Sequence, residues 1–203
     1  MKKYAVLHEP GDIVTLAGTR FVVLDVERRG SLPDSLFLLA LESVGASEFG
    51  SSNNYAESDL KKAVDKWLED MGKRGLDNAK LIPREIDLTT LDGSGCYGKL
   101  SVKAAPLTLD EAREYADIIP NAERWCWLAT GWSGPSKSDG DLALGVNSYG
   151  DWNYSLCSNS YGIRPALKVP SILFEDSEAG LDLSKIPTDD LLQEIHRRLA
   201  EKA

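Results

Sequence analysis

The hydrophobic period changes along this chain of 203 residues, and that change constrains the fold more than any single motif does. Residues 13–16 and 20–26 are rich in β-branched side chains and flank a short turn, which predicts a β-hairpin. The apolar run 36–41 predicts a third, buried strand. Residues 57–71 then repeat with a helical period, and strand-like segments return in the last third. Because strands and helices do not alternate regularly, an α+β fold is predicted rather than repeated βαβ units.

Two helices are predicted between the strand regions. The first covers Glu57–Met71, with Ser58 as its N-cap and Gly72 as its C-terminal stop. The second opens with a capping box at residues 108–111, Thr-Leu-Asp-Glu, and is expected to end before Pro120. Apolar residues recur on one face of each segment, so both helices are expected to pack against a core.

The last third of the domain combines short predicted strands with polar sequence. Strands are expected at residues 125–128, with alternating heavy side chains, at 142–146 and at 163–169. Pro165 indicates that the last of them is an edge strand or begins there. Residues 129–161 are otherwise poor in signals of regular structure, so long polar loops are expected. Their tryptophans and tyrosines argue against disorder, because disordered segments are poor in aromatic residues.

The charge balance bears on the possible partners. The formal net charge is −9 and the pI is near 4.8, and the longest basic clusters are short and have acidic neighbours. Binding to nucleic acid is therefore not expected, because it needs clustered Lys and Arg. No cleaved signal peptide and no apolar run of membrane-spanning length is evident. A cytoplasmic or virion-associated protein is expected.

The cysteines do not indicate a disulfide framework or a zinc site. Cys96, Cys126 and Cys157 are odd in number and lack a CxxC spacing, so reduced thiols are expected, some of them buried. The Asp139–Asp141 stretch provides too few oxygen ligands for calcium, since the spacing of an EF-hand loop is absent. No metal and no cofactor is predicted.

Several segments resemble a family of bacterial and phage domains of unknown function. The segments "WCWLAT" (125–130), "LALGVNSYGDWN" (142–153) and "YGIRPALKV" (161–169) resemble its Trp-Trp-Leu-Arg-Ser-like strand, Val-Asn-Ser-x-Gly loop and terminal Arg-Pro-Ala-Leu strand. The stretches "FLLALES", "LKKAVDKWLEDM" and "LIPREIDL" resemble earlier parts of the family, so the resemblance covers about residues 10–169. The chain departs from the family at Leu128-Ala129-Thr130, which lacks the arginine, and in its C-terminal tail.

The resemblance implies a C-type-lectin-like fold of the formylglycine-generating-enzyme branch. It also implies similarity to the variable proteins of diversity-generating retroelements, in which the surface before the last core strand carries hypervariable, ligand-contacting positions. Residues 1–169 are accordingly assigned to one ligand-binding domain. Residues 170–203 are assigned to an acidic connector and a C-terminal helix starting at Thr188, through which the protein could form an oligomer.

A ligand-binding surface is predicted just before the last core strand. Tyr and Trp bury large areas while losing few rotors, and Asn and Ser offer adaptable hydrogen bonds. The expected partner is a protein or glycan on another cell or particle, met by a phage or bacterial surface structure. The predicted contact residues are Trp132, Tyr149, Trp152, Asn153, Tyr154, Ser155, Asn159 and Tyr161.

Two alternatives to a non-enzymatic binding protein stay open. Formylglycine-generating enzymes use a cysteine pair near the end of the fold, so Cys157 with Cys126 could form a cysteine-oxidising centre. A structural assembly protein would instead bury the tail helix in an oligomer. The sequence favours neither, because a nucleophile usually needs a nearby His and the chain has only His8 and His196, both expected at the surface.

Two further groups of residues are expected to have structural roles. Trp67, Trp125 and Trp127 lie on the predicted buried positions of a helix and a strand, so they are expected in the core. Arg164 is expected to form an ion pair with Asp or Glu beneath the polar loops.

Overall fold

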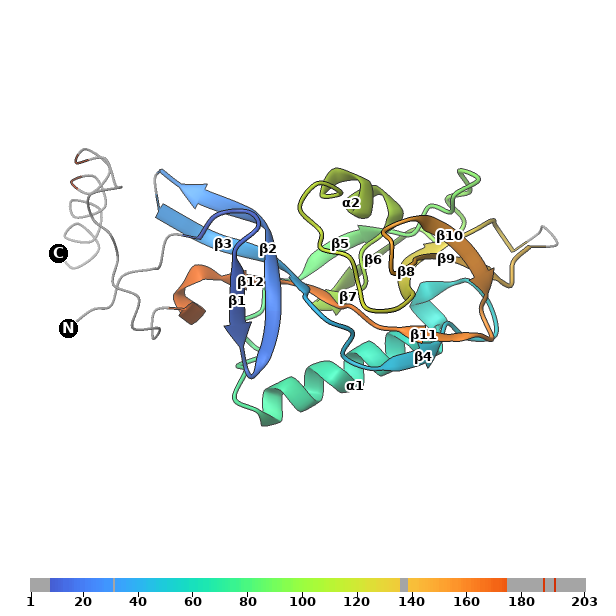
Figure 1. Ribbon diagram of the computed structural model, residues 1–203, viewed down its shortest axis with the longest axis horizontal. Coiled ribbons are helices and arrows are strands. Elements are labelled where there is room, and N and C mark those ends of the chain that lie inside the picture. Colours follow the sequence, from blue (N-terminus) through green and yellow to red (C-terminus); the bar gives the residue numbers. More distant parts are fainter. Residues whose placement is uncertain (1–7, 31, 136–138, 175–187, 189–191, 193–203) are drawn as a thin grey trace.

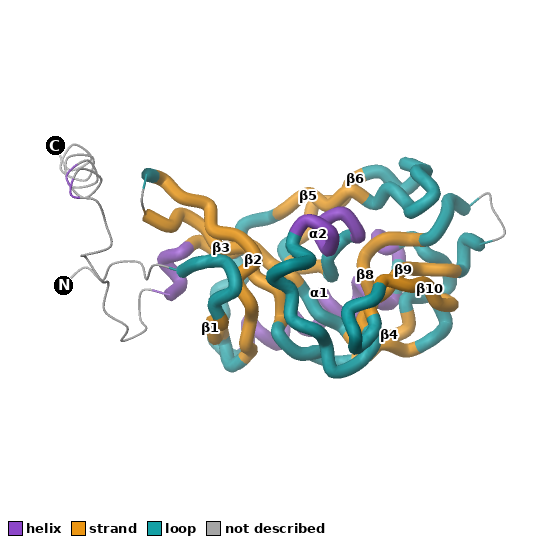
Figure 2. The backbone as a smooth tube through the Cα atoms, turned by 45° about the horizontal axis from the view of Figure 1, so that its top comes forward, coloured by secondary structure: helices purple, strands orange, loops and turns teal. Residues whose placement is uncertain are grey.

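The computed structural model describes residues 8–30, 32–135 and 139–174, together with Thr188 and Leu192. Its described part is an α+β fold with two α-helices, two five-stranded sheets and a two-stranded sheet (Figure 1), which confirms the predicted class. The two large sheets lie toward opposite ends of an elongated body, and α1 (Asp59–Lys73) runs along both (Figures 1 and 2). This helix contacts β7 and β2 of the first sheet and β4 of the second, so it joins the two halves.

The first sheet has the strand order β1-β2-β3-β12-β7, and all its pairings are antiparallel. The predicted hairpin is confirmed, and its two turn residues, Ala17 and Gly18, have φ values of +46° and +74°. Positive φ at both positions is what a two-residue turn needs to match the twist of the strands. The strands are β1 (Ile13–Leu16), β2 (Thr19–Arg29), β3 (Leu32–Ala40), β7 (Ala104–Ala105) and β12 (Ala166–Pro170).

The second sheet has the order β10-β9-β8-β11-β4, in which β11 runs parallel to β8 and antiparallel to its other neighbour. A separate two-stranded sheet pairs β5 with β6. The strands are β4 (Ala46–Glu48), β8 (Cys126–Gly131), β9 (Leu142–Val146), β10 (Trp152–Leu156) and β11 (Ser160–Gly162), with β5 (Arg84–Asp87) and β6 (Lys99–Val102).

Helix α1 begins as predicted, because the Ser58 hydroxyl accepts the backbone N–H of Lys61 at 2.9 Å. The predicted stop at Gly72 is wrong. The helix continues to Lys73, and the chain leaves it at Gly75, whose φ of +103° only glycine adopts readily. Gly72 instead gives space to a neighbour: a Cβ there would lie 3.0 Å from Nδ2 of Asn78.

A short 3₁₀ turn, η1 (Tyr55–Glu57), precedes α1. The second helix, α2 (Leu109–Glu114), comes later in the chain, after β7. Its predicted capping box between Thr108 and Glu111 is present. The expected extension to Pro120 is wrong, because regular helix ends at Glu114 and turns follow. These turns keep the chain compact as it passes back toward β8.

Strand β8 differs from the expected half-buried strand, because all six of its residues are buried. Trp127 and Ala129 belong to a large apolar cluster with the buried face of α1, whereas Leu128 belongs to a smaller cluster with α2. The strand is therefore covered on both faces, which removes the expected alternation. Of the three tryptophans expected in the core, Trp127 is fully buried, and Trp67 and Trp125 are half-buried.

Apart from the predicted strand at 142–146, which is β9, residues 129–161 were expected to form long loops. That expectation is wrong. The end of β8, all of β10 and most of β11 lie in this range, and the polar composition of β10 conceals a strand at the sheet edge. The prediction of one strand over residues 163–169 is also wrong. The chain leaves the second sheet at Gly162 and enters the first at Ala166, so Pro165 stands directly before β12, as the predicted strand start requires.

His8 packs against η2 (Ser171–Phe174), the 3₁₀ turn that follows β12. The His8 ring lies edge-on to Phe174, with 5.4 Å between ring centroids. The expected surface position of His8 is therefore wrong: it is half-buried, and burial lowers its pKa, an effect that Asp12 partly opposes. His196 and almost all of the predicted C-terminal helix lie outside the described residues. Among the described helices, none is long and apolar enough to cross a membrane.

Candidate ligand-binding surface

The turn between β9 and β10 is organised by Asn147. Its Oδ1 accepts the backbone N–H groups of Tyr149 at 2.8 Å and Asp151 at 3.0 Å, while its Nδ2 donates to the Asp151 carboxylate at 3.1 Å. Gly150 donates its N–H to the Asn147 carbonyl and has a φ of +89°. Asn147 was not among the predicted contact residues, although an Asn three residues before a Gly is a recognisable turn signal. The turn is thus held by its own side chain–backbone hydrogen bonds.

Four large apolar side chains are exposed on this turn and on β10. We call them the hairpin surface. Tyr149 is 82% exposed, and Trp152, Tyr154 and Leu156 are between 43% and 48% exposed. The last three alternate along β10 and therefore share one face of the sheet. Leu156 is an addition to the predicted set, which consisted of aromatic and polar residues only.

Two contacts fix the rings of the hairpin surface. Trp132 stacks obliquely on Tyr154, with 4.2 Å between ring centroids. The Arg113 guanidinium of α2 lies over the Trp152 ring, 5.7 Å from its centroid. Trp132 itself is half-buried against the smaller core cluster, so it supports Tyr154 more than it contacts solvent. Rings that are already held lose less freedom when a partner binds.

The other predicted residues lie on the opposite face of the same sheet. The Ser155 hydroxyl is 3.0 Å from the Tyr161 hydroxyl and accepts a hydrogen bond from Asn159 Nδ2 at 2.8 Å. The Tyr161 ring is half-buried between two tryptophans, at centroid distances of 5.1 Å from Trp125 and 4.9 Å from Trp127. The structure therefore divides the eight predicted residues: Trp132, Tyr149, Trp152 and Tyr154 lie together, whereas Asn153, Ser155, Asn159 and Tyr161 do not join them.

The backbone of β10 has one free edge in the described part of the protein, because β10 is the last strand of its sheet. The Leu142 carbonyl accepts the Trp132 N–H, so Leu142 directs its backbone toward β8. Alternation then directs Ala143 and Gly145, the partners of Ser155 and Asn153, toward β10. The backbone groups of Trp152, Tyr154 and Leu156 consequently face the free edge. There, Asn153 Oδ1 accepts the Tyr154 N–H at 2.8 Å.

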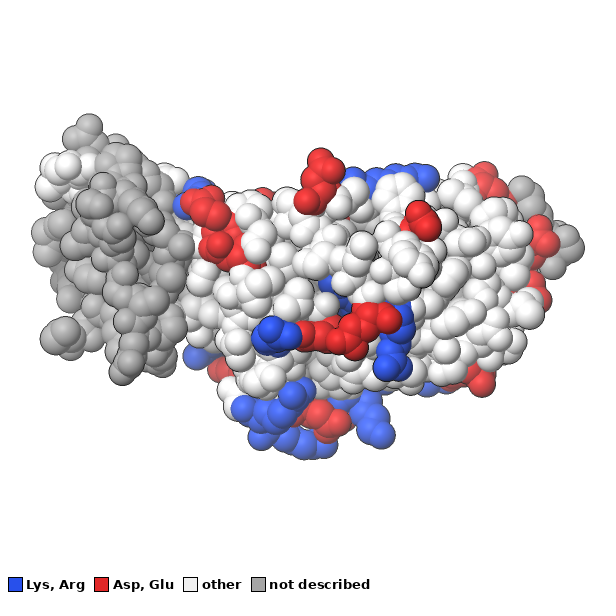
Figure 3. Space-filling model, in the orientation of Figure 1, with Lys and Arg blue, Asp and Glu red and all other residues white. Residues whose placement is uncertain are grey.

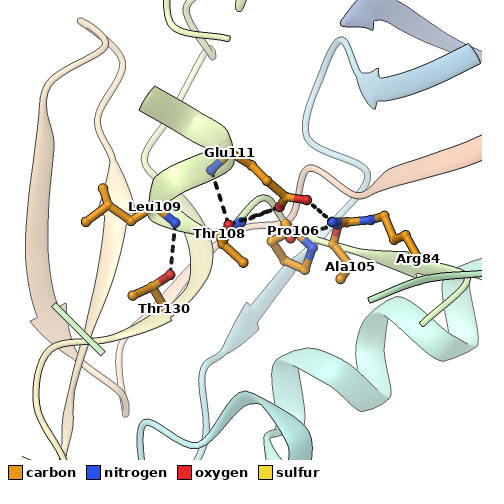
Figure 4. A network of polar contacts seen from close by, with 7 residues as sticks. All are labelled: Arg84, Ala105, Pro106, Thr108, Leu109, Glu111 and Thr130. Carbon is orange, nitrogen blue, oxygen red and sulfur yellow. Dashed lines mark hydrogen bonds and ion pairs between the residues drawn. The ribbon is translucent and has the colours of Figure 1, made fainter. Parts of the chain in front are cut away.

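A buried polar network positions α2 beside the hairpin surface (Figure 4). Arg84 forms an ion pair with Glu111 and donates from Nη2 to the carbonyls of Ala105 at 3.1 Å and Pro106 at 3.3 Å. Burial lowers the pKa of Arg84, and the Glu111 carboxylate opposes that shift. The same carboxylate accepts the Thr108 N–H at 2.8 Å, which closes the capping box. One glutamate thus links the start of α2 to β5 and β7.

Thr130 completes this network from the other side. Its hydroxyl accepts the Leu109 N–H at 2.9 Å, as Figure 4 shows. Thr130 therefore connects β8 to the start of α2. The sequence analysis did not identify Arg84, Glu111 or Thr130 as connected, because they are separated in sequence and share no motif.

The Asn53 side chain connects the segment after β8 with the start of β9. Its buried amide donates to the carbonyls of Ser133 and Leu142, each at 2.9 Å, and accepts the Tyr97 hydroxyl at 2.6 Å. A Cβ at Gly131 would lie 2.9 Å from atoms of Asn53, so glycine is required for this close approach. Sequence reasoning missed this residue, because a single Asn in a polar stretch carries no signal of its buried partners.

The cysteines are arranged as structural thiols. Cys126 and Cys157 are buried and Cys96 is exposed, and all three are free, which confirms the prediction. Burial raises the pKa of Cys126 to about 11 and that of Cys157 to about 12. Both are therefore thiols rather than nucleophilic thiolates near neutral pH.

Arg164 forms no ion pair with the described acidic residues, so the expected ion pair is not found there. It is buried, and its Nε and Nη1 donate to the backbone carbonyls of Ala40 at 2.9 Å and Pro120 at 3.0 Å. The nearby carboxylate of Glu42 is engaged by Arg20 instead. The prediction was wrong because the crossing between the two sheets provides backbone acceptors where a carboxylate was expected.

Few charges lie on the face that includes β8–β10 (mostly white in Figure 3). Within the described residues, no group of three or more His, Cys, Asp or Glu side chains could hold a metal ion. No protein-family model matches the chain, and searches of curated proteins and of solved structures also find no match.

Proposed function

We propose that the protein is a non-enzymatic ligand-binding protein that engages a protein partner through the hairpin surface. One observation carries this proposal. Of the eight large apolar side chains exposed in the described residues, four lie on the eight-residue stretch from Tyr149 to Leu156. Exposed apolar clusters of this kind, on a protein whose other large apolar side chains are mostly buried, are typical of interaction sites. Tyr and Trp are also the residue types that dominate binding energy at interfaces.

The free edge of β10 favours a protein over a glycan as the partner. An extended peptide can add a strand to such an edge, with main-chain hydrogen bonds for affinity and alternate side chains for specificity. Trp152, Tyr154 and Leu156 have backbone groups at this edge and side chains on one face. A peptide would have to displace Asn153 from the Tyr154 N–H and Asn159 from the Leu156 carbonyl, so Trp152 is the position already open for pairing. The acidic net charge argues against nucleic acid.

The buried thiols support the non-enzymatic part of the proposal. A cysteine-oxidising centre needs accessible, ionisable sulfur, whereas burial raises the pKa of both Cys126 and Cys157. We therefore expect Cys157→Ser to leave partner binding unchanged. A loss of binding on that substitution, without loss of folding, would support the enzyme alternative instead.

We also propose that the chain has the fold and the variable segment of the family that its sequence resembles. The finer assignment, a C-type-lectin-like fold, is supported by the antiparallel sheets and by the order in which two helices precede the strands that carry the exposed rings. We also propose that residues 147–161 vary between relatives, as in the variable proteins of diversity-generating retroelements, in a cytoplasmic or virion-associated protein. Adenine-directed variation in this segment among related genes, next to a reverse transcriptase gene, is the expected result. A segment no more variable than β2 would contradict it.

The partner can be sought with a photo-cross-linking residue at Tyr149, in the host cell. A matched protein carries the same residue at Ile13, which is a similarly apolar, exposed position on the edge strand of the other sheet. Cross-links found at Tyr149 and not at Ile13 define partners of the hairpin surface.

The affinity of a partner found in this way tests the proposal. Tyr154→Ala should weaken binding by about 1–3 kcal/mol, or roughly 5- to 150-fold in Kd, because a ring held by Trp132 is removed from the contact. Ile13→Ala serves as the control and should leave Kd unchanged. If Tyr154→Ala leaves Kd unchanged as well, the hairpin surface is not the binding site.

A further inference from the structure

A pocket of about 260 Å³ lies beside the hairpin surface, between the turns that follow α2 and the sheet of β8 and β9. Gly150 forms part of its rim, and a Cβ there would lie 2.7 Å from Oδ1 of Asn121, so the β9–β10 turn sits directly against the α2–β8 connection. The apolar walls include Leu39, Leu107, Ile119, Leu128 and Val146.

One charged residue lines this pocket, and it is Arg164. Its side chain is more than nine-tenths buried. Its Nε and Nη1 donate to backbone carbonyls, but among the described residues its buried Nη2 has no hydrogen-bond partner. An unpaired donor on a buried cation costs free energy, and a guanidinium stays protonated in proteins. The Glu42 carboxylate, which raises the pKa of Arg164, is already paired with Arg20.

We infer that this pocket binds a small organic acid, whose carboxylate pairs with the guanidinium of Arg164 and whose apolar body lies between the α2 turns and β8–β9. A single negative charge fits, because the pocket offers one cation and otherwise mainly apolar walls. A phosphate or a nucleotide would need further donors. The volume is below the range of about 300–1,000 Å³ typical of sites for drug-sized molecules, so a compact ligand is expected.

This inference goes beyond the proposed partner-binding function and does not depend on it. Tyr149 and Trp152 border both sites, but Tyr154 does not line the pocket. Tyr154→Ala should therefore leave acid binding intact, whereas it weakens partner binding. Failure of one proposal is thus distinguishable from failure of the other.

The test uses octanoate and phenylacetate as probes, with binding to the full chain measured by isothermal titration calorimetry. Octanamide and phenylacetamide have the same apolar bodies without the charge. We expect at least one acid to bind. Its amide should have a Kd at least about tenfold higher, because a hydrogen bond to a charged group is lost. An amide that binds as well as its acid overturns the inference, and so does the absence of binding by both acids.

Variants locate the bound acid. Arg164→Gln removes the charge but also disturbs two backbone contacts, so a second variant keeps the test independent of folding. Ala116 lies exposed at the pocket, and Ala116→Phe should block it. Ala79→Phe, at an exposed alanine outside the pocket, is the matched control. Loss of acid binding in Ala116→Phe and its retention in Ala79→Phe support the site. Equal binding by both variants overturns it.

Discussion

Each of the two large sheets has a hairpin at one edge, and the two hairpins use their apolar side chains in opposite ways. In β1 the side chains alternate, so that Val14 and Leu16 enter the core. In β10 the apolar side chains Tyr154 and Leu156 stay about half exposed, although their strand has the same edge position. The first hairpin therefore contributes to stability. The second leaves its apolar side chains about half in water.

The largest expected effect is a difference in stability loss between two Leu→Ala substitutions, one on each edge strand. Leu16→Ala should lower the free energy of unfolding by about 2–4 kcal/mol, because it leaves a cavity in the core. Leu156→Ala should cost less than about 1 kcal/mol, since much of that side chain is already in water. Urea denaturation of both variants measures the difference. Equal losses would mean that β10 is a structural strand and that the comparison fails.

The second expected effect concerns how the two turns are built. The β1–β2 turn depends on backbone conformation, whereas the β9–β10 turn depends on the side chain of Asn147. Asn147→Ala should lower stability by about 1–2 kcal/mol, because two backbone N–H groups lose their acceptor. Ser148→Ala, at the exposed neighbouring position, should change it by less than about 0.5 kcal/mol. Thermal or urea unfolding gives both values, and a silent Asn147→Ala would show that the turn is held by its backbone alone.

The smallest expected effect is a pH dependence confined to the first half of the molecule. Burial lowers the pKa of His8 in the folded protein below its ordinary value near 6.5. The unfolded chain then takes up a proton first as the pH falls, so this residue's contribution to stability is present above pH 6.5 and is lost below it. His8→Gln should flatten the fall in stability between about pH 7 and 5.5. An unchanged slope would show that His8 is solvated in the folded protein.

Elements set by neighbouring residues could be predicted from sequence more completely than elements set by pairing between distant segments. The β1–β2 hairpin, the Ser58 cap and the Thr108 capping box follow from local rules, because each needs only neighbouring residues. Strand β10 could not be recognised, since an edge strand that buries little lacks the apolar alternation that marks a strand. The short strands β4 and β7 were missed for a related reason: only their partners from distant parts of the chain define them.

The candidate site was predicted in part. The aromatic residues of the hairpin surface were identified from composition, and the structure brings Trp132 to Tyr154 and Tyr149 close to Trp152 at the pocket. Composition could not separate the two faces of β10, so Ser155 and Tyr161 were grouped with residues on the far side. Arg84, Asn53 and the free Nη2 of Arg164 depend on contacts between distant segments, which no local pattern encodes.

The position of the last strands has a consequence for how the protein is made. Strand β12 lies between β3 and β7, and β11 lies between β8 and β4. Neither large sheet is therefore complete until residues 160–170 have been synthesised. A nascent chain that stops at β10 has two incomplete sheets with unpaired strand edges, which expose the chain to aggregation. Folding of this protein must therefore complete late, after nearly the whole domain has left the ribosome. A premature stop codon before Ser160 should leave only β1–β2–β3 and β8–β9–β10 paired, as two three-stranded sheets with unpaired edges.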